Sequence, residues 1–461
     1  MAAQTDTPSR KREPRPKKDP ALRNKMYKYR LYPTRKQADT LEWILRRCKE
    51  IYNAALQERT EAYRMCGVSV TYDMQAAQLP VIKEDRPEFQ AIYSQVLQDV
   101  LQRMKKAMDT FFRRVTNGET PGYPRYKSNS RYHSFTYPQG GYDILGVPSS
   151  LKKNGKKTGK LALSKIGHIK MVVHRPIKGT IKTCTINHEG DQWYACLSVD
   201  YRFDASQAFH PSTEQVGIDV GITNYAVLSN GEVIENPRIS RATEEKIKAA
   251  HRQLAPRKQG SHRCNRAKRE LTRLYRKTRH RRQDFLHKAA RRLVNQYGTL
   301  VFEDLQIMNM SARPQPKKDE ATGAFLPNGA AAKGGLNKSI RDAAWGTFTR
   351  LCASKAEEAG CTVAKVAPHH TSQICSGCGA MVPKDLSVRW HSCPTCRAEL
   401  DRDENAARTI LARYLHPETP LVHPKKKASR RSKNASDGAG RVPQEFEVVQ
   451  ATPDSCRSPQ L

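Results

Sequence analysis

Residues 215–228 read Gln-Val-Gly-Ile-Asp-Val-Gly-Ile-Thr-Asn-Tyr-Ala-Val-Leu and predict a β-hairpin that opens an α/β domain. Two short apolar runs are expected to form its strands, and the chain turns through Gly221 and Asn224. Asp219 interrupts the first run and would be costly to bury unless it binds a cation or another partner. The flanking glycines, Gly217 and Gly221, would let the backbone of a ligand approach closely. A structural aspartate in a hairpin turn is the alternative.

Two more carboxylates occupy positions that suit ligand binding. Glu303 follows the apolar run 299–302, at the carboxyl end of a predicted strand, where open α/β sheets bind their ligands. A solvated strand end is the alternative there. Asp403 lies within 400–407, at the start of a predicted helix, and its alternative role is that of an N-cap.

The three acids together predict a magnesium site. Clustered carboxylates repel one another and have little use without cations. With two Mg²⁺ ions about 3.5–4 Å apart, they would form a site that hydrolyses phosphodiesters by in-line displacement. One ion would activate water, and the other would stabilise the leaving 3′ oxygen. Asp219, Glu303 and Asp403, on a protein that binds polyanions, therefore predict a magnesium-dependent nuclease.

Four clustered cysteines predict a structural zinc site. Two Cys-x-x-Cys pairs are separated by fourteen residues, a spacing typical of a tetrahedral Cys₄ zinc ribbon. The four residues are Cys375, Cys378, Cys393 and Cys396. Because cysteine fills all four ligand positions, no position stays open for catalysis. A redox-active pair is the alternative, but it does not explain why there are two pairs.

The net charge predicts a polyanionic partner. The 461 residues carry 81 Lys and Arg against 45 Asp and Glu, a formal charge of +36 that nucleic acid would neutralise. A ribosomal-type binder without chemistry is the alternative. No apolar run approaches the roughly 18 residues of a membrane span, and the N-terminus lacks the apolar segment of a signal peptide. Eight cysteines are scattered singly, so we expect an intracellular, cytoplasmic protein associated with the nucleoid.

Two segments are candidates for contact with nucleic acid. Residues 238–292 are predicted to form one long basic helical stretch, with twenty Lys and Arg against four acids, and its arginines could pair with phosphates. Residues 121–127 read Pro-Gly-Tyr-Pro-Arg-Tyr-Lys, where aromatic rings could stack on bases. The candidate residues are Tyr123, Arg125, Tyr126, Lys127, Arg273, Arg276 and Arg279. A surface turn and a solvated helix face are the alternatives.

The N-terminal part of the chain changes from strand to helix and back. Residues 26–32 alternate like a strand, and Thr34 with Gln37 is a capping-box signature for the helix that follows. An apolar stripe predicts a second helix at about 90–115, and 119–205 has short β-type runs. A helical block thus interrupts a β region. Further along we expect a strand at 232–234, a flexible loop at 311–336, a helix at 339–359 and a strand at 362–366.

Several motifs, in order, resemble the TnpB family, insertion-sequence proteins related to the type V CRISPR effector nucleases. The resemblance covers about residues 25–414 and is strongest at 217–221, 282–288, 302–305, 309–310, 342–346, 371–375 and 401–407. It implies an RNase H-like RuvC domain with the zinc ribbon inserted before its last acid. It also implies an N-terminal β-barrel interrupted by a helical recognition module.

The resemblance also implies a function, which is RNA-guided cleavage of double-stranded DNA beside a short flanking motif. Guide RNA and target DNA would be the partners, and we expect a monomer on its RNA. The family's three magnesium-binding acids correspond to Asp219, Glu303 and Asp403. Asp401 is the competing position, but the family pattern places the ligand just before the Asn-Ala-Ala helix start. The loop at 311–336 and the N-terminal arm depart from a minimal family member.

Two other functions are weighed against cleavage. A guided DNA-binding regulator would share the basic features but would lack one or more of the acids. A transposase that joins strands could use three acids, although the motif order favours the nuclease. The expected fold is multidomain α/β. Its parts are a disordered basic arm (1–24), a wedge-like β-barrel (25–37 and 119–210), a helical recognition module (38–118), a RuvC-like nuclease domain (211–370 and 398–415), the zinc ribbon (371–397) and a disordered tail (416–461).

Overall fold

The structure is a computed structural model that describes residues 22–146, 158–203, 212–385 and 387–417. The expected basic arm and C-terminal tail lie almost entirely outside these ranges. The expected arm boundary at residue 24 is wrong, because the strand β1 (Leu22–Tyr32) already begins at Leu22. Its first residues pair with the end of the strand β7 (Gln192–Arg202), where Leu22 lies opposite Arg202.

β1 is the central strand of a seven-stranded antiparallel sheet, ordered β2-β6-β7-β1-β5-β4-β3. Alternation along the strand buries Tyr27, Tyr29 and Leu31 on one face. The remaining strands are β2 (Ser134–Tyr137), β3 (Tyr142–Leu145), β4 (Thr158–Leu163), β5 (Gly167–Val172) and β6 (Thr180–Glu189). Strands far apart in the sequence therefore share one core.

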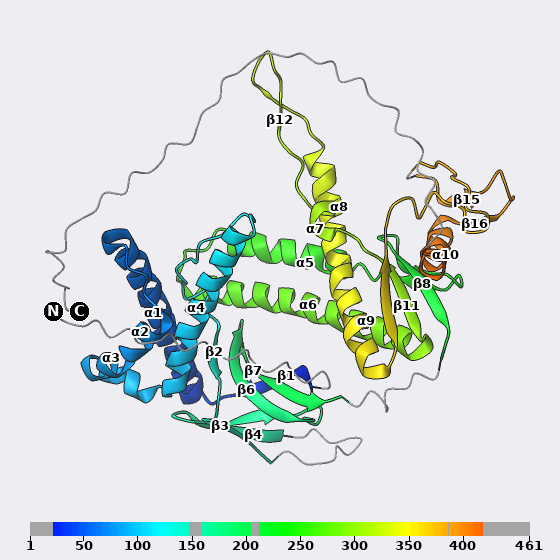
Figure 1. The fold of residues 1–461 in the computed structure, drawn as a ribbon. Helices are drawn as coiled ribbons and strands as arrows, with labels where there is room; N and C mark the ends of the chain where they lie inside the picture. The colour runs from blue at the N-terminus through cyan, green and yellow to red at the C-terminus, as the bar shows by residue number, and fades with distance from the viewer. Residues whose placement is uncertain (1–21, 147–157, 204–211, 386, 418–461) are drawn as a thin grey trace, which may run out of the picture. The chain divides into compact units, whose positions relative to one another are not determined.

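A helical block separates β1 from the rest of its sheet in the sequence (Figure 1). The longest helix, α1 (Arg35–Cys66), begins with the predicted capping box, in which Thr34 and Gln37 each accept a backbone hydrogen bond from the other. The predicted second helix is α4 (Ser94–Thr116), which packs against α1. Between them lie α2 (Tyr72–Ala77), α3 (Leu79–Asp85) and the 3₁₀ turn η1 (Pro87–Ala91).

A second sheet, of five strands, contains two of the candidate acids. Its order is β10-β9-β8-β11-β14. The strands are β8 (Gln215–Val220), β9 (Asn224–Leu228), β10 (Val233–Glu235), β11 (Thr299–Glu303) and β14 (Thr362–Val366). The predicted hairpin is β8 and β9, and the predicted third strand is β10; these three strands pair antiparallel. β11 runs parallel to both β8 and β14. The helix α10 (Arg402–Leu415) packs against β8 and β11.

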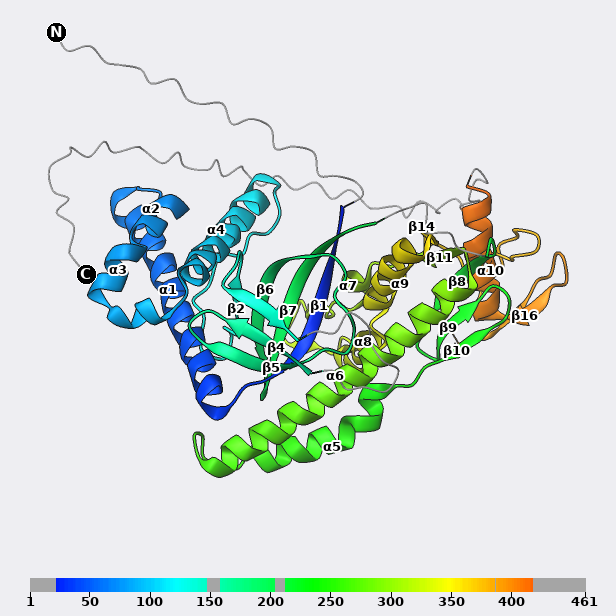
Figure 2. The ribbon, with the colours of Figure 1, turned by 90° about the horizontal axis from the view of Figure 1, so that it is seen from below.

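The basic stretch at 238–292 is two helices, α5 (Ile239–Leu254) and α6 (His262–Gln296), which lie side by side (Figures 1 and 2). The prediction of one continuous helix is wrong. Pro256 cannot donate a helical hydrogen bond, and Gly260 has a φ of +86°, so the chain reverses between the helices.

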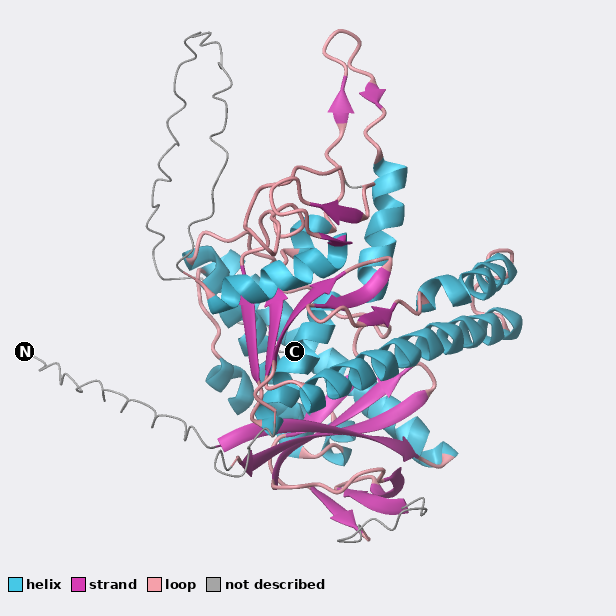
Figure 3. Ribbon diagram, turned by 90° about the vertical axis from the view of Figure 1, so that its right-hand side faces the viewer, coloured by secondary structure: helices cyan, strands magenta, loops and turns pink. Residues whose placement is uncertain are grey.

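The predicted helix at 339–359 is also divided. Its parts belong to α8 (Ala330–Ala343) and α9 (Trp345–Ala359), because Ala344 adopts a left-handed conformation with φ 54° between them. α8 also occupies the end of the segment predicted as a loop, 311–336. The rest of that segment contains a short hairpin, β12 (Lys317–Lys318) and β13 (Phe325–Leu326), which projects beyond α8 (Figure 3).

A small module connects β14 to α10. It contains the four clustered cysteines and a two-stranded sheet of β15 (Trp390–Ser392) and β16 (Glu399–Asp401).

The remaining element is a turn of helix, α7 (Ile307–Met310), which follows β11. None of the helices in the described ranges has the length and apolar character that a membrane span requires.

Candidate active site and zinc ribbon

Two of the predicted acids lie side by side at the carboxyl ends of neighbouring parallel strands. Ile218 of β8 pairs with Phe302 of β11, and the next residue on each strand is an acid, Asp219 and Glu303. Paired residues of adjacent strands point to the same face of a sheet. Phe302 points to the opposite face, where its ring lies 5.9 Å from that of Phe348. The strand pairing therefore places both carboxylates on one face.

Gly217 brings the third acid to the same face. Because Gly217 lies two residues before Asp219, it faces the same side, and α10 crosses β8 there. A Cβ on Gly217 would lie 2.1 Å from the carbonyl oxygen of Ala407 and 2.8 Å from the nitrogen of Leu411. The expectation that a ligand backbone approaches this glycine is wrong, since the backbone of α10 occupies that space. Asp403 lies one helical turn before Ala407, close to Asp219.

Substituting Gly217 should displace α10 and with it Asp403. We expect Gly217→Ala to destabilise the fold by about 1–3 kcal/mol, the usual cost of forcing atoms into a packed contact. DNA cleavage should fall more than stability predicts, because the acids separate. Thermal unfolding and cleavage assays measure both effects. Gly334→Ala in α8 is the matched control, because a Cβ there meets nothing within 4 Å; equal losses in the two variants would contradict the close-approach argument.

The structure separates the two competing acids at the start of α10. Asp401 is the N-cap, and its carboxylate accepts from the backbone N–H groups of Asp403 (2.8 Å) and Glu404 (3.3 Å). The alternative of Asp403 as the N-cap is therefore wrong. The Asp403 carboxylate instead lies 3.4 Å from the guanidinium of Arg402 and 3.6 Å from that of Arg389, and 14% of its side chain is exposed.

The charges of the other two acids act on Asp219. Burial, followed by the nearby charges of Glu303 and Asp403, raises the pKa of Asp219 well above its usual value. Burial also raises the pKa of Glu303, while a hydrogen bond from Thr371 and the charge of Arg413 oppose the shift. Among the described residues, only the four cysteines bring three or more ligand atoms within 4.8 Å of one another. The acids are close enough to repel, and a divalent cation between them would relieve that repulsion.

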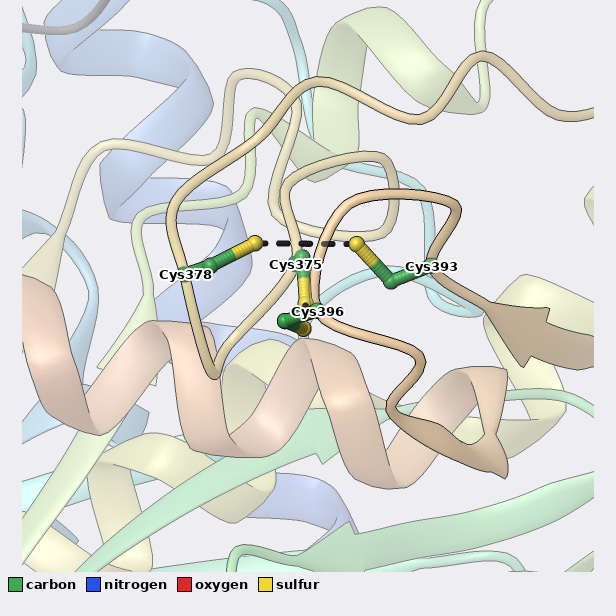
Figure 4. Close-up of side chains that lie close together, drawn as sticks. All are labelled: Cys375, Cys378, Cys393 and Cys396. Carbon is green, nitrogen blue, oxygen red and sulfur yellow. Dashed lines mark hydrogen bonds between the residues drawn. The ribbon is translucent and has the colours of Figure 1, made fainter.

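The four cysteines form the predicted metal site (Figure 4). The sulfur atoms of Cys375 and Cys396 are 3.5 Å apart, and those of Cys378 and Cys393 are 3.6 Å apart. A tetrahedron with Zn–S bonds of about 2.3 Å has edges of about 3.8 Å, so the thiols fit a zinc ion. Backbone hydrogen bonding, chiefly at Cys396, lowers the pKa of the Cys393 thiol to about 6. A backbone hydrogen bond at Ala398 acts in the same direction on Cys396, but side-chain hydrogen bonds with Cys375 and Cys378 outweigh it and raise the pKa of that thiol.

Comparison with known proteins places this arrangement in a family. Residues 198–313 match the family described as "Probable transposase", 345–410 match "Cas12f1-like, TNB domain", and 23–67 match "Helix-turn-helix domain". "Putative RNA-guided DNA endonuclease InsQ" of Escherichia coli (strain K12) is 29% identical, over 84% of this chain and 91% of its own. A "Putative RNA-guided DNA endonuclease" of Streptomyces pristinaespiralis is 29% identical, over 89% and 94% of the two chains. The chain belongs to the TnpB family.

A solved structure shows the same fold as this TnpB-family chain. The "mini-RNA-guided endonuclease CRISPR-Cas_phi3" superposes with a TM-score of 0.52 at 9% identity, over 88% of this chain and 94% of that one. The helix-turn-helix description does not fit residues 23–67 here. They form β1 and the uninterrupted helix α1.

The predicted phosphate-binding arginines of this TnpB-family protein are engaged in ion pairs. Arg273 pairs with Glu270 at 2.6 Å within α6. Arg276 and Arg279 pair with acids of the β6–β7 hairpin: Arg276 with Asp191, and Arg279 with Glu189 at 2.5 Å. The Arg276 side chain is 13% exposed. Arg276 and Arg279 therefore join α6 to the seven-stranded sheet, a role that the charge pattern did not indicate.

The predicted aromatic segment lies along α1. The Tyr123 hydroxyl is 3.1 Å from that of Thr60, and its ring packs edge-on against Phe111. The Lys127 ammonium lies 5.6 Å from the centre of the Tyr52 ring. Arg125 and Tyr126 are exposed. The structure does not bring this segment together with the three acids.

Sequence reasoning assigned no role to two residues that join the ribbon to the acids. Thr371 is buried, and its hydroxyl donates a hydrogen bond to Glu303. Asn405 is fully buried in α10, where its amide donates to the Ile374 carbonyl at 2.7 Å and accepts from the Ser376 N–H at 2.9 Å. Both lie in motifs that carry the TnpB resemblance, 371–375 and 401–407, but no local pattern indicated their contacts.

Proposed function

We propose that this protein is an RNA-guided, magnesium-dependent DNA endonuclease of a transposon. The observation that carries the proposal is the placement of Asp219 and Glu303 on two paired parallel strands, where the charges of Glu303 and of Asp403 from α10 act on Asp219. The full-length relatives described as RNA-guided DNA endonucleases support it. A polyanion-binding charge of +36 fits the same function.

Within this proposal, the five-stranded sheet is the core of an RNase H-like RuvC domain. The seven-stranded sheet is a wedge-like β-barrel, and the helices between β1 and β2 are its recognition module. The parallel strands β8 and β11 present their acids at the carboxyl end of the sheet, where α/β folds bind ligands. The zinc ribbon is then an insertion before the last acid.

The three acids would hold the catalytic magnesium ions. When bound, magnesium activates a water for attack on the phosphodiester and stabilises the leaving 3′ oxygen. Asp219 and Glu303 contribute from adjacent strands, and Asp403 contributes from α10. Arg389 and Arg402 lie against Asp403 and offset its negative charge.

The proposed partners are a guide RNA and double-stranded target DNA. Base pairing with the guide would select the sequence, while the protein reads a short flanking motif and the backbone. Exposed Arg125 and Tyr126 are the proposed contacts from the aromatic segment. Among the paired arginines, Arg273 and Arg279 are about half exposed and could still reach phosphates. We propose that the protein acts as a monomer on its RNA.

The decisive test is whether RNA directs cleavage. RNA that co-purifies with the protein should contain a guide, and sequencing identifies it. Replacing the guide's target-pairing segment should redirect cleavage to the new sequence with the protein unchanged. Cleavage at one DNA sequence whatever the RNA, or cleavage without RNA, would leave an ordinary metal-dependent nuclease.

The matched description "Probable transposase" favours one other candidate, a strand-transfer enzyme. Three acids could serve that reaction equally well. The products separate the two candidates. An endonuclease leaves DNA ends, whereas a transposase joins a supplied transposon end to the target.

A further inference from the structure

A buried hydroxyl at the root of the zinc ribbon touches the candidate metal site. Thr371, which is 5% exposed, directs its hydroxyl to an Oε1 oxygen of Glu303. The same hydroxyl lies 3.4 Å from the carbonyl of Pro368, a longer and weaker contact. A hydroxyl has one hydrogen to donate, and the Glu303 carboxylate, which makes the shorter contact, accepts it.

Contacts on both sides hold Thr371 in place. Before it, the Arg413 guanidinium donates to the carbonyls of Ala367 (2.6 Å) and His369 (2.5 Å). After it, the Ile374 carbonyl accepts from the Asn405 amide at 2.7 Å. Arg413 and Asn405 both belong to α10, the helix that carries Asp403. One helix therefore positions both Asp403 and the segment that contacts Glu303.

We infer that Thr371 is a positioning residue that orients the Glu303 carboxylate for metal binding, and that the ribbon root links the zinc module to the metal site. This inference rests on the proposed function, since it takes Glu303 as a metal ligand. Glu303 ends its strand, so the backbone of β11 alone leaves its side chain several rotamers. The hydrogen bond occupies one carboxylate oxygen and directs the other. Outer partners of metal ligands commonly act in this way.

The test compares metal binding by zinc-loaded, full-length variants, with Mn²⁺ as the probe and its electron paramagnetic resonance as the readout. We expect Thr371→Val, which keeps the shape but removes the hydroxyl, to weaken Mn²⁺ binding about 10- to 100-fold. Thr371→Ser keeps the hydroxyl and should retain most of the affinity. Cleavage by the guided complex should need a correspondingly higher Mg²⁺ concentration.

Thr278→Val is the matched control. Thr278 is also buried in the nuclease part, but its hydroxyl contacts Leu274 and Thr243 and no acid. Zinc content and melting temperature establish that each variant is folded. If Thr371→Val does not fold, Thr371→Ala carries the same expectation.

Three outcomes separate the inference from the proposal beneath it. Wild-type affinity in Thr371→Val, together with loss of Mn²⁺ in Glu303→Ala, would overturn the positioning role alone. Equal weakening in Thr371→Val and Thr278→Val would overturn it too, because the effect would then be general destabilisation. Unchanged Mn²⁺ binding in Glu303→Ala would show that Glu303 is no metal ligand, which would remove the proposed site itself.

Discussion

Alanine at Asp219, Glu303 or Asp403 is expected to reduce DNA cleavage by about 10³-fold or more, the upper range for removing one electrostatic stabiliser from an active site. The physical reason is that each acid would supply charge that holds magnesium, while the surfaces that contact nucleic acid are left unchanged. Binding of guide RNA and target DNA should therefore persist. Cleavage assays at saturating protein, paired with binding measurements, test both parts.

A control variant accompanies the alanine series. Asp401→Ala removes the N-cap of α10, so it should cost about 1 kcal/mol of stability and leave cleavage largely intact. If Asp401→Ala did not cleave DNA and Asp403→Ala did, Asp401 and not Asp403 would be the third acid of the site.

In the presence of a chelator, the Asp219→Asn variant should have a higher melting temperature than the wild type. Burial and like charges raise the pKa of Asp219, so its ionised form destabilises the metal-free fold at neutral pH.

Loss of one ribbon thiol is expected to release the zinc. Wild-type protein should carry one zinc per chain, and Cys378→Ser should lose most of it. Metal-binding energy is folding energy in such small modules, so the ribbon should then unfold locally and expose new protease sites within 371–397. Cleavage should also fall, because the ribbon root contacts Glu303 through Thr371. Elemental analysis and limited proteolysis provide the measurements.

Cys66→Ser is the matched control for the zinc prediction. Cys66, like Cys378, is exposed, but it lies at the end of α1, outside the four-cysteine cluster. Its zinc content should equal that of the wild type. Protein purified without chelator that holds no zinc, or a Cys378→Ser variant that keeps it all, would contradict the prediction.

Local patterns predicted much of this fold. The alternation at 26–32, the capping box at Thr34 and the hairpin at 215–228 all reappear in the structure. Those features depend on residues close together in the chain, and hydrophobic periodicity and turn chemistry report such residues directly. The predicted helices were wrong where the helical pattern of the sequence continued across a break between two helices. Helical character on both sides of Pro256 and of Ala344 predicted one helix, and the structure has two.

For the candidate site, too, local patterns predicted some features, and others depended on the tertiary structure. Spacing identified the four cysteines, because the ligands of a zinc ribbon come from two short Cys-x-x-Cys motifs that can be recognised in the sequence. The three acids could be singled out by position and by family resemblance. Their grouping on one face depends on the pairing of β8 with β11 and on the contact of α10 with Gly217. Asp401 and Asp403 differ in role only because one of them caps the helix.

The sequence by itself determined the chemistry that this protein can hold: a Cys₄ zinc site, three acids in apolar or helix-start settings, and a charge that needs a polyanion. Only the tertiary structure decided how these parts act on one another. It showed that Gly217 makes room for a helix, that Arg276 and Arg279 tie α6 to a hairpin, and that Thr371 reaches Glu303. These contacts join residues tens of positions apart, and their energies come from packing and desolvation that no local pattern encodes.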